Sequence, residues 1–164
     1  MTVYRYCTPD WLAESAVRYR DTPSFQERLE KLSMTVCFNV KAEPDWGIEE
    51  DIIFGTQVER GELKNLSFYS KERAQQEADF ILAAKPQEWK RILRKESKFV
   101  GDFMTGKITL EQGSKVGVLG LAPHSGTMVD ALTQLELQFP DEMTSQELEE
   151  YRRDMQAFRK ELGV

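Results

Sequence analysis

A change of hydrophobic period constrains this chain more than any other feature of its sequence. Between residues 33 and 69, apolar and polar residues alternate in three runs, 33–41, 48–59 and 63–69, which short Pro- and Gly-containing breaks separate. A period of two is typical of strands that bury one face. Because the connections are short, the three runs predict an antiparallel meander.

Apolar residues at helical spacing lie on both sides of the meander. Before it, the Thr-Pro pairs at Thr8-Pro9 and Thr22-Pro23 each provide a hydroxyl cap and a first-turn proline, which predicts two short helices. The elements predicted after it are a helix from Pro86, a helix that ends at Gly106, a short strand over Lys107–Glu111 and a helix from Met128 to Phe139.

Residues 70–85 are ambiguous when they are considered alone. Ser70 is a good N-cap, and Lys71 to Glu77 contains good helix formers. The apolar stretch from Ala78 to Ala83 could continue that helix or form a strand. Intrinsic propensity slightly favours the helix.

The C-terminal segment, residues 144–164, predicts one amphipathic helix. Thr144 and Glu147 form a capping box after the boundary at Pro140–Met143. Its apolar seam is short for an independent coiled coil, so docking on the same domain is preferred, and a homodimer stays open. The seam residues are Leu148, Tyr151, Met155, Phe158 and Leu162.

Charge and composition exclude several classes of function. The net charge of −6 argues against a partner with a phosphate backbone, so no nucleic acid is expected. No apolar run approaches the roughly 18 residues of a membrane span, and the N-terminal stretch lacks the layout of a signal peptide. Cys7 and Cys37 have no metal-ligand spacing. We therefore expect a reduced, cytoplasmic protein without stable membrane insertion, although a single disulfide stays open.

The stretch from Ala78 to Gly113 resembles the second half of the sterol carrier protein (sterol-transfer) family. An Ala-Asp-led apolar strand, a turn, a helix with a tryptophan and leucines, a second short helix and a strand follow one another in the order of that family. The matching residues here are Ala78-Asp79, Trp89 with Leu93, Gly106-Lys107 and Gly113. With the meander, the resemblance covers residues 33–139.

This resemblance implies a fold and a kind of site. The fold would be α+β, with a curved, mostly antiparallel five-stranded sheet covered on one face by helices, and 78–83 would be a strand. The family has an apolar tunnel for sterols, acyl chains or other lipids and no catalytic residues. We expect a single domain over 1–164, in which 1–32 adds a helical extension and 144–164 a C-terminal helix.

The cavity of such a domain would be walled by the inward strand faces and by the helices opposite them. The predicted function is to carry or sequester a hydrophobic small molecule, with no metal or cofactor, although each wall residue could equally fill a solid core. The candidate ligand-binding residues are Phe38, Ile53, Phe80, Leu82, Trp89, Phe103, Ile108, Leu110, Leu119, Leu121, Met128 and Leu132.

Three questions stay open in the sequence. The glycine-rich segment 115–126 departs from the family and could form a mobile gate or a tight packing contact between helix and sheet. The adjacent His124 and Ser125 could suggest an enzyme, but no acidic residue is nearby to orient the histidine, and Ser125 is better explained as a helix cap. The alternative function is a protein-protein interaction module with a filled or vestigial cavity.

Overall fold

The three alternating runs form one side of a five-stranded sheet with the order β4-β3-β2-β5-β6. The computed structural model of the protein describes residues 2–164. All neighbouring strands are antiparallel except β2 and β5, which are parallel, so the sheet is mostly antiparallel as predicted. The strands are β2 (Ser33–Val40), β3 (Ile52–Glu59), β4 (Glu62–Tyr69), β5 (Phe80–Ala84) and β6 (Thr109–Gln112).

The ambiguous segment divides into a helix and a strand. Helix α3 (Lys71–Glu77) begins where the Ser70 hydroxyl accepts a hydrogen bond from the Arg73 backbone N–H. The chain becomes extended at Ala78 and continues into β5, where the parallel ladder to β2 satisfies its backbone groups. The resemblance was therefore right about this strand, and helix propensity was the weaker guide.

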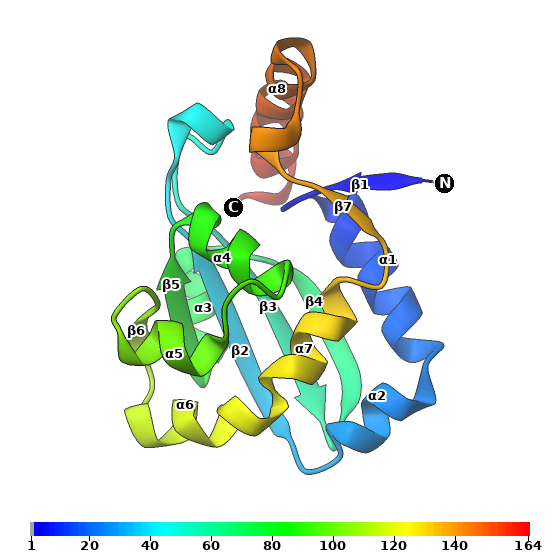
Figure 1. Cartoon of the computed structure of the whole chain (residues 1–164), viewed down its shortest axis with the longest axis vertical. Coiled ribbons are helices and arrows are strands. Elements are labelled where there is room, and N and C mark those ends of the chain that lie inside the picture. Colours follow the sequence, from blue (N-terminus) through cyan, green and yellow to red (C-terminus); the bar gives the residue numbers. More distant parts are fainter. Residues whose placement is uncertain (1) are drawn as a thin grey trace.

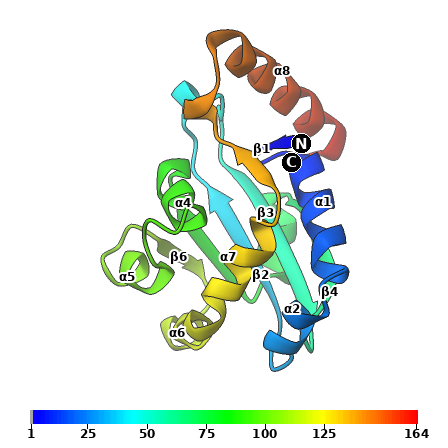
Figure 2. The same cartoon turned by 45° about the vertical axis from the view of Figure 1, so that its right-hand side comes forward.

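Most of the helices cover one face of the sheet, which we call the inner face (Figures 1 and 2). Helix α3 lies on the other, outer face, where it encloses a small second cluster with Cys37, Ile53 and Tyr69. The helices of the inner face are α1 (Pro9–Arg20), α2 (Pro23–Arg28), α4 (Pro86–Leu93), α5 (Phe99–Met104), α6 (Lys115–Leu121) and α7 (Ser125–Leu132). The 3-10 turns are η1 (Pro44–Trp46), η2 (Ala122–His124) and η3 (Pro140–Glu142).

A second, two-stranded sheet joins the N-terminal segment to the segment that follows α7. Strands β1 (Val3–Arg5) and β7 (Glu136–Gln138) pair in parallel, and the backbone N–H of Tyr6 donates to the Gln138 carbonyl at 2.9 Å. The prediction of a helix from Met128 to Phe139 was therefore wrong in its second half. Pairing with β1 holds these residues extended, whatever their local preference.

Helix α8 (Ser145–Leu162) docks on its own domain. Both hydrogen bonds of the predicted capping box, between Thr144 and Glu147, are present. The Tyr151 hydroxyl donates to the Tyr6 carbonyl at 2.6 Å, and the ring of Phe158 stacks on Phe68 with centroids 5.1 Å apart. The seam is thus used within one chain, and a homodimer stays a prediction.

The two cysteines are free and buried. Cys7 belongs to the main core, whereas Cys37 lies in the cluster on the outer face, so no disulfide joins them. Burial raises the pKa of each thiol to about 12. Across residues 2–164, no helix has the length and apolar character needed to span a bilayer.

Candidate functional site

The strand register places a row of apolar side chains across the middle of the inner face. Phe38 lies opposite Phe54 on β3 and Leu82 on β5. The row continues to Phe68 on one side and to Leu110 on the other. Although Phe38 is at the centre of the sheet, its side chain is only half-buried. Side chains therefore do not completely fill the space above the middle of this row.

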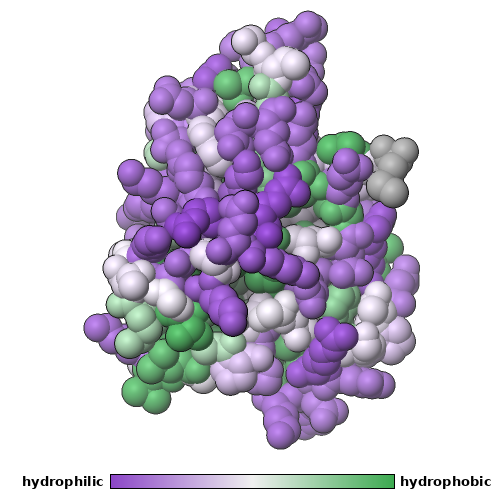
Figure 3. Space-filling model, viewed as in Figure 1, coloured by the Kyte–Doolittle hydropathy of each residue, from purple (hydrophilic) through white to green (hydrophobic). Residues whose placement is uncertain are grey.

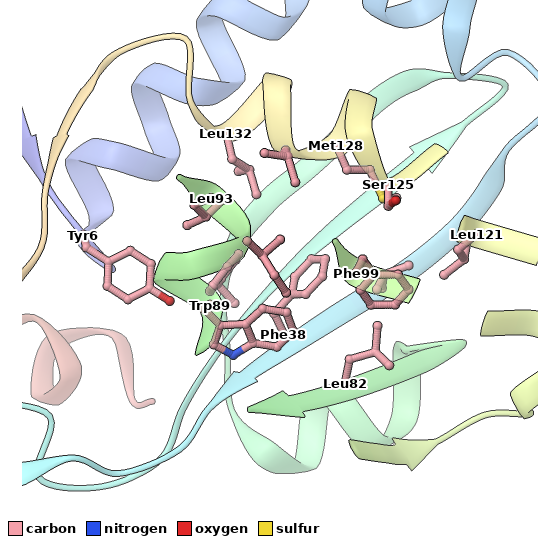
Figure 4. Close-up of a pocket in the computed structure, with 14 residues that line it drawn as sticks. Tyr6, Phe38, Leu82, Trp89, Leu93, Phe99, Leu121, Ser125, Met128 and Leu132 are labelled. Atoms are coloured by element: carbon pink, nitrogen blue, oxygen red, sulfur yellow. The ribbon is translucent and has the colours of Figure 1, made fainter. Parts of the chain in front are cut away.

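That space is an apolar cavity of about 60 Å³ between the sheet and helices α4 and α7 (Figure 4). Trp89 of α4 forms one wall, with its ring perpendicular to that of Phe38 and its indole N–H donating to the Asn39 carbonyl at 3.3 Å. The lining residues are Tyr6, Val36, Phe38, Phe54, Leu82, Trp89, Ile92, Leu93, Phe99, Leu121, Ser125, Met128, Val129 and Leu132.

A second apolar hollow of about 40 Å³ adjoins the first, under α1 and α7. Phe38, Met128 and Leu132 line both hollows, so these three side chains form the partition between them. The space is therefore divided and is smaller than the roughly 300–1,000 Å³ of typical ligand pockets. A lipid would have to displace this partition, and two of its three side chains, Met128 and Leu132, belong to α7.

Helix α7 covers the core but makes few buried contacts with it. None of its residues is buried. Three polar contacts fix it: the Trp11 indole N–H donates to the Leu132 carbonyl at 3.0 Å, and Asp130 forms ion pairs with Lys95 at 2.8 Å and Arg28 at 3.8 Å. Elements with few buried contacts open at low free-energy cost. Helix α7 is thus the wall best able to move.

The first hollow has a mouth, a surface groove between α5 and α7. Ile92, Phe99, Ser125 and Val129 line both the hollow and the groove, so the two spaces adjoin and these side chains lie between them. Lys95 and Lys98 lie at its rim. Apolar surface gathers beside it over α5 and α6 (Figure 3). Its most exposed side chains are Val100, Met104, Val116 and Leu119.

Half of the twelve predicted site residues line the first hollow: Phe38, Leu82, Trp89, Leu121, Met128 and Leu132. The other six lie elsewhere. Ile53 faces the outer side with Tyr69, and Leu119 is 45% exposed on α6. Ile108 is buried in the main core, and Phe80, Phe103 and Leu110 pack against it without reaching the hollow.

Sequence reasoning also missed some wall residues. Val36 and Phe54 share the alternating face that contains Phe38, and Ile92 shares the helical stripe of Trp89, so the same periodicity could have found them. Tyr6 could not have been found in this way, because it lies in a short segment before the first helix, outside the residues that resemble the family.

The glycine-rich segment was predicted to form either a mobile gate or a tight packing contact, and its glycines differ in this respect. Side chains at Gly113 or Gly117 would collide with the Phe80 ring, so these glycines make a tight packing contact. A Cβ added at Gly120 or Gly126 would meet no atom outside the local backbone within 4 Å, so no close packing requires glycine there. Ser125 does not cap α7 as predicted, because its hydroxyl donates to the Ala122 carbonyl at 2.8 Å.

The cavity wall offers few polar atoms. The polar side-chain atoms of Trp89 and Ser125 are already hydrogen-bonded, and the Tyr6 hydroxyl is without a partner in the described chain. Over residues 2–164, no group of three or more His, Cys, Asp or Glu side chains could hold a metal ion. The arrangement is therefore suited to enclosing an apolar molecule.

The sheet and its helices define an α+β domain with the sterol carrier protein fold. A conserved hypothetical protein of Thermus thermophilus, described as a candidate sterol carrier protein, superposes with a TM-score of 0.67 at 16% identity, over 80% of this chain and 90% of the other. A crystal structure of sterol carrier protein 2 gives 0.66 at 16% identity, over 78% and 97%. The apo form of sterol carrier protein 2 from Yarrowia lipolytica gives 0.54 at 14% identity, over 76% and 88%.

No family model and no curated protein matches the sequence. At these identities the three solved structures show that the fold is shared. They confirm the five-stranded, helix-covered domain that the stretch from Ala78 to Gly113 predicted. The ligand has to be argued from the cavity itself.

Proposed function

We propose that the protein holds or carries a hydrophobic small molecule, such as a lipid or an acyl chain, in the cavity between β2, β3, β5 and helices α4 and α7. The observation that carries this proposal is an apolar hollow that adjoins a groove on the surface. Each methylene moved from water into such surroundings gains about 0.8 kcal/mol. A ligand chain can therefore bind without many hydrogen bonds.

In this proposal α7 moves to admit the ligand. Displacing Met128 and Leu132 would merge the two hollows into one longer space. Because Met side chains are flexible, this partition can adapt at small cost. The exposed apolar side chains of α5 and α6 would give the ligand a path to the mouth. Because Ser125 is hydrogen-bonded to a backbone carbonyl, we assign no catalytic role to it or to His124.

The exposed apolar side chains on α5 and α6 also favour a second candidate, the protein-protein interaction module. Patches of this kind commonly mark interaction sites. Native mass spectrometry of freshly purified protein separates the two functions. Co-purified lipid supports the carrier. A protein free of lipid that binds neither fluorescent fatty acids nor a neutral apolar dye would exclude the carrier and leave the module.

Val129→Trp should block ligand binding, because Val129 lines both the hollow and its mouth. We expect at least a tenfold loss of affinity for a fluorescent fatty acid, with a stability cost of about 1–3 kcal/mol from overpacking. The matched control is Val17→Trp, since Val17 is 49% exposed on α1, away from the hollow. Equal affinities in the two variants would contradict the assignment of the cavity.

Asp130→Asn should speed ligand exchange, because it removes the charge that ties α7 to Lys95 and Arg28. We expect about a twofold faster dissociation of a fluorescent fatty acid in stopped-flow measurements. The stability change should stay within about 0.5 kcal/mol, since exposed ion pairs contribute little. Glu14→Gln, which removes an exposed pair with Arg18 on α1, is the control. Unchanged dissociation would show that α7 does not limit ligand exchange.

A further inference from the structure

Two buried hydroxyls that line the hollows have no hydrogen-bond partner within residues 2–164: Tyr6 in the first hollow and Ser15 in the second. The Tyr6 hydroxyl is the one at the end of the first hollow. Its side chain is 0% exposed, and within residues 2–164 no group hydrogen-bonds to the hydroxyl. A buried hydroxyl without a partner is costly, and native proteins rarely keep one without a reason. Here the hydroxyl lies in the wall of the hollow, where a bound molecule could supply the missing partner.

The position of Tyr6 is fixed on both sides of its ring and along its backbone. Its N–H donates to the Gln138 carbonyl at 2.9 Å, and its carbonyl accepts from the Tyr151 hydroxyl at 2.6 Å. Its ring stacks on Phe139 with centroids 4.8 Å apart and contacts Trp11 at 5.2 Å. The hydroxyl therefore cannot turn away to find another partner without breaking this packing.

Figure 4 shows that Tyr6 lies at the end of the cavity opposite Phe99 and Ser125, which line the mouth. Its oxygen points inward, towards Trp89. Burial raises the pKa of Tyr6 well above its usual value, so the phenol stays protonated and can donate. The polar atom is thus at the closed end, the end where a simple acyl-chain pocket would be purely apolar.

We infer that the ligand is a neutral, oxygen-bearing lipid that binds with its oxygen at the closed end, hydrogen-bonded to the Tyr6 hydroxyl. This inference rests on the proposed function. A long-chain alcohol, ketone, ester or sterol has the required group. A carboxylate does not fit there, because a single hydroxyl cannot replace the hydration of a full charge and the wall contains no cation. Lys95 and Lys98 are at the mouth, the opposite end.

The test compares 1-decanol with decane, which differ by the oxygen, in displacement of a neutral apolar dye. For each protein we take the ratio of the affinity for 1-decanol to the affinity for decane. Both values come from displacement of the same dye, so a change in the affinity for the dye does not alter the ratio. We expect Tyr6→Phe to lower the preference for the alcohol about five- to tenfold, the usual contribution of one hydrogen bond. Tyr69→Phe is the matched control, because that buried tyrosine lies on the outer face and accepts from Asn65.

The outcomes separate this inference from the proposed function. If both probes bind and Tyr6→Phe leaves the ratio unchanged, the hydroxyl serves another partner such as a trapped water, and the inference is overturned while the carrier stands. If neither probe binds the wild-type protein, both are overturned. Should Tyr6→Phe fail to fold, a wild-type preference for decane over decanol would still overturn the inference, because a free donor at the closed end should favour the alcohol.

Discussion

Trp89→Ala is expected to destabilise the protein by about 3–5 kcal/mol, the usual cost of removing a buried tryptophan. Trp89 is 6% exposed, contacts Phe38 edge-on and gives its indole N–H to the Asn39 carbonyl. The substitution removes these contacts and enlarges a cavity that is already present. Urea unfolding measures the loss. Trp46→Ala, at a half-buried tryptophan of η1, should cost clearly less.

The same variant offers a second readout. Indole should fill the space that Trp89→Ala leaves, as small aromatics fill engineered apolar cavities, and should raise the melting temperature of the variant in proportion to its occupancy. The wild-type protein should not respond, because its own side chain occupies the space. If indole stabilised neither protein, the prediction that Trp89→Ala leaves an open apolar space would be contradicted.

Gly61→Ala is expected to lower the free energy of unfolding by about 3 kcal/mol or more, because two separate costs add. Gly61 is in the left-handed region, with φ of 77°, where a non-glycine residue loses roughly 1–2 kcal/mol. A Cβ there would also lie 2.3 Å from the Gln26 carbonyl oxygen, so α2 would have to move away from the β3–β4 turn. Urea unfolding of the variant measures this loss.

Two other glycines separate these causes. Gly106 also has a positive φ, 83°, but a Cβ added there would meet nothing within 4 Å, so Gly106→Ala should show the conformational cost alone, about 1 kcal/mol. At Gly120, inside α6, an added Cβ would also meet nothing and φ is ordinary, so Gly120→Ala should be neutral or stabilising. Equal losses at Gly61 and Gly106 would contradict the contact between α2 and the turn.

Much of the fold could be predicted, because its strands have a strong local pattern. The alternation around Phe38 and Phe54 gave the meander, and the capping box at Thr144 gave the start of α8. Strand β5 needed the resemblance, since its backbone is satisfied by β2, over 40 residues earlier. The pairing of β1 with β7 could not be predicted, because strands of three residues are too short to show a period.

The site was predicted less completely than the fold, for a physical reason. Periodicity indicates which side chains face inward, and Phe38, Leu82 and Trp89, which it selected, line the hollow. It does not indicate where packing fails to fill the space, which depends on how far α7 stands from the sheet. Ile53 was a different error, since its place in the alternation, next to Phe54, already assigned it to the outer face.

The closed end of the cavity is built from segments that are far apart in the chain. Tyr4 pairs with Leu137, 133 positions later, and this joint holds Tyr6 in the wall. At roughly 5–20 residues per second, a ribosome needs about 7–27 seconds to make that stretch. Throughout this interval the nascent inner face stays uncovered at that end. Biogenesis of this domain should therefore depend on chaperone protection until β7 emerges, and a ligand of the proposed kind should bind only afterwards.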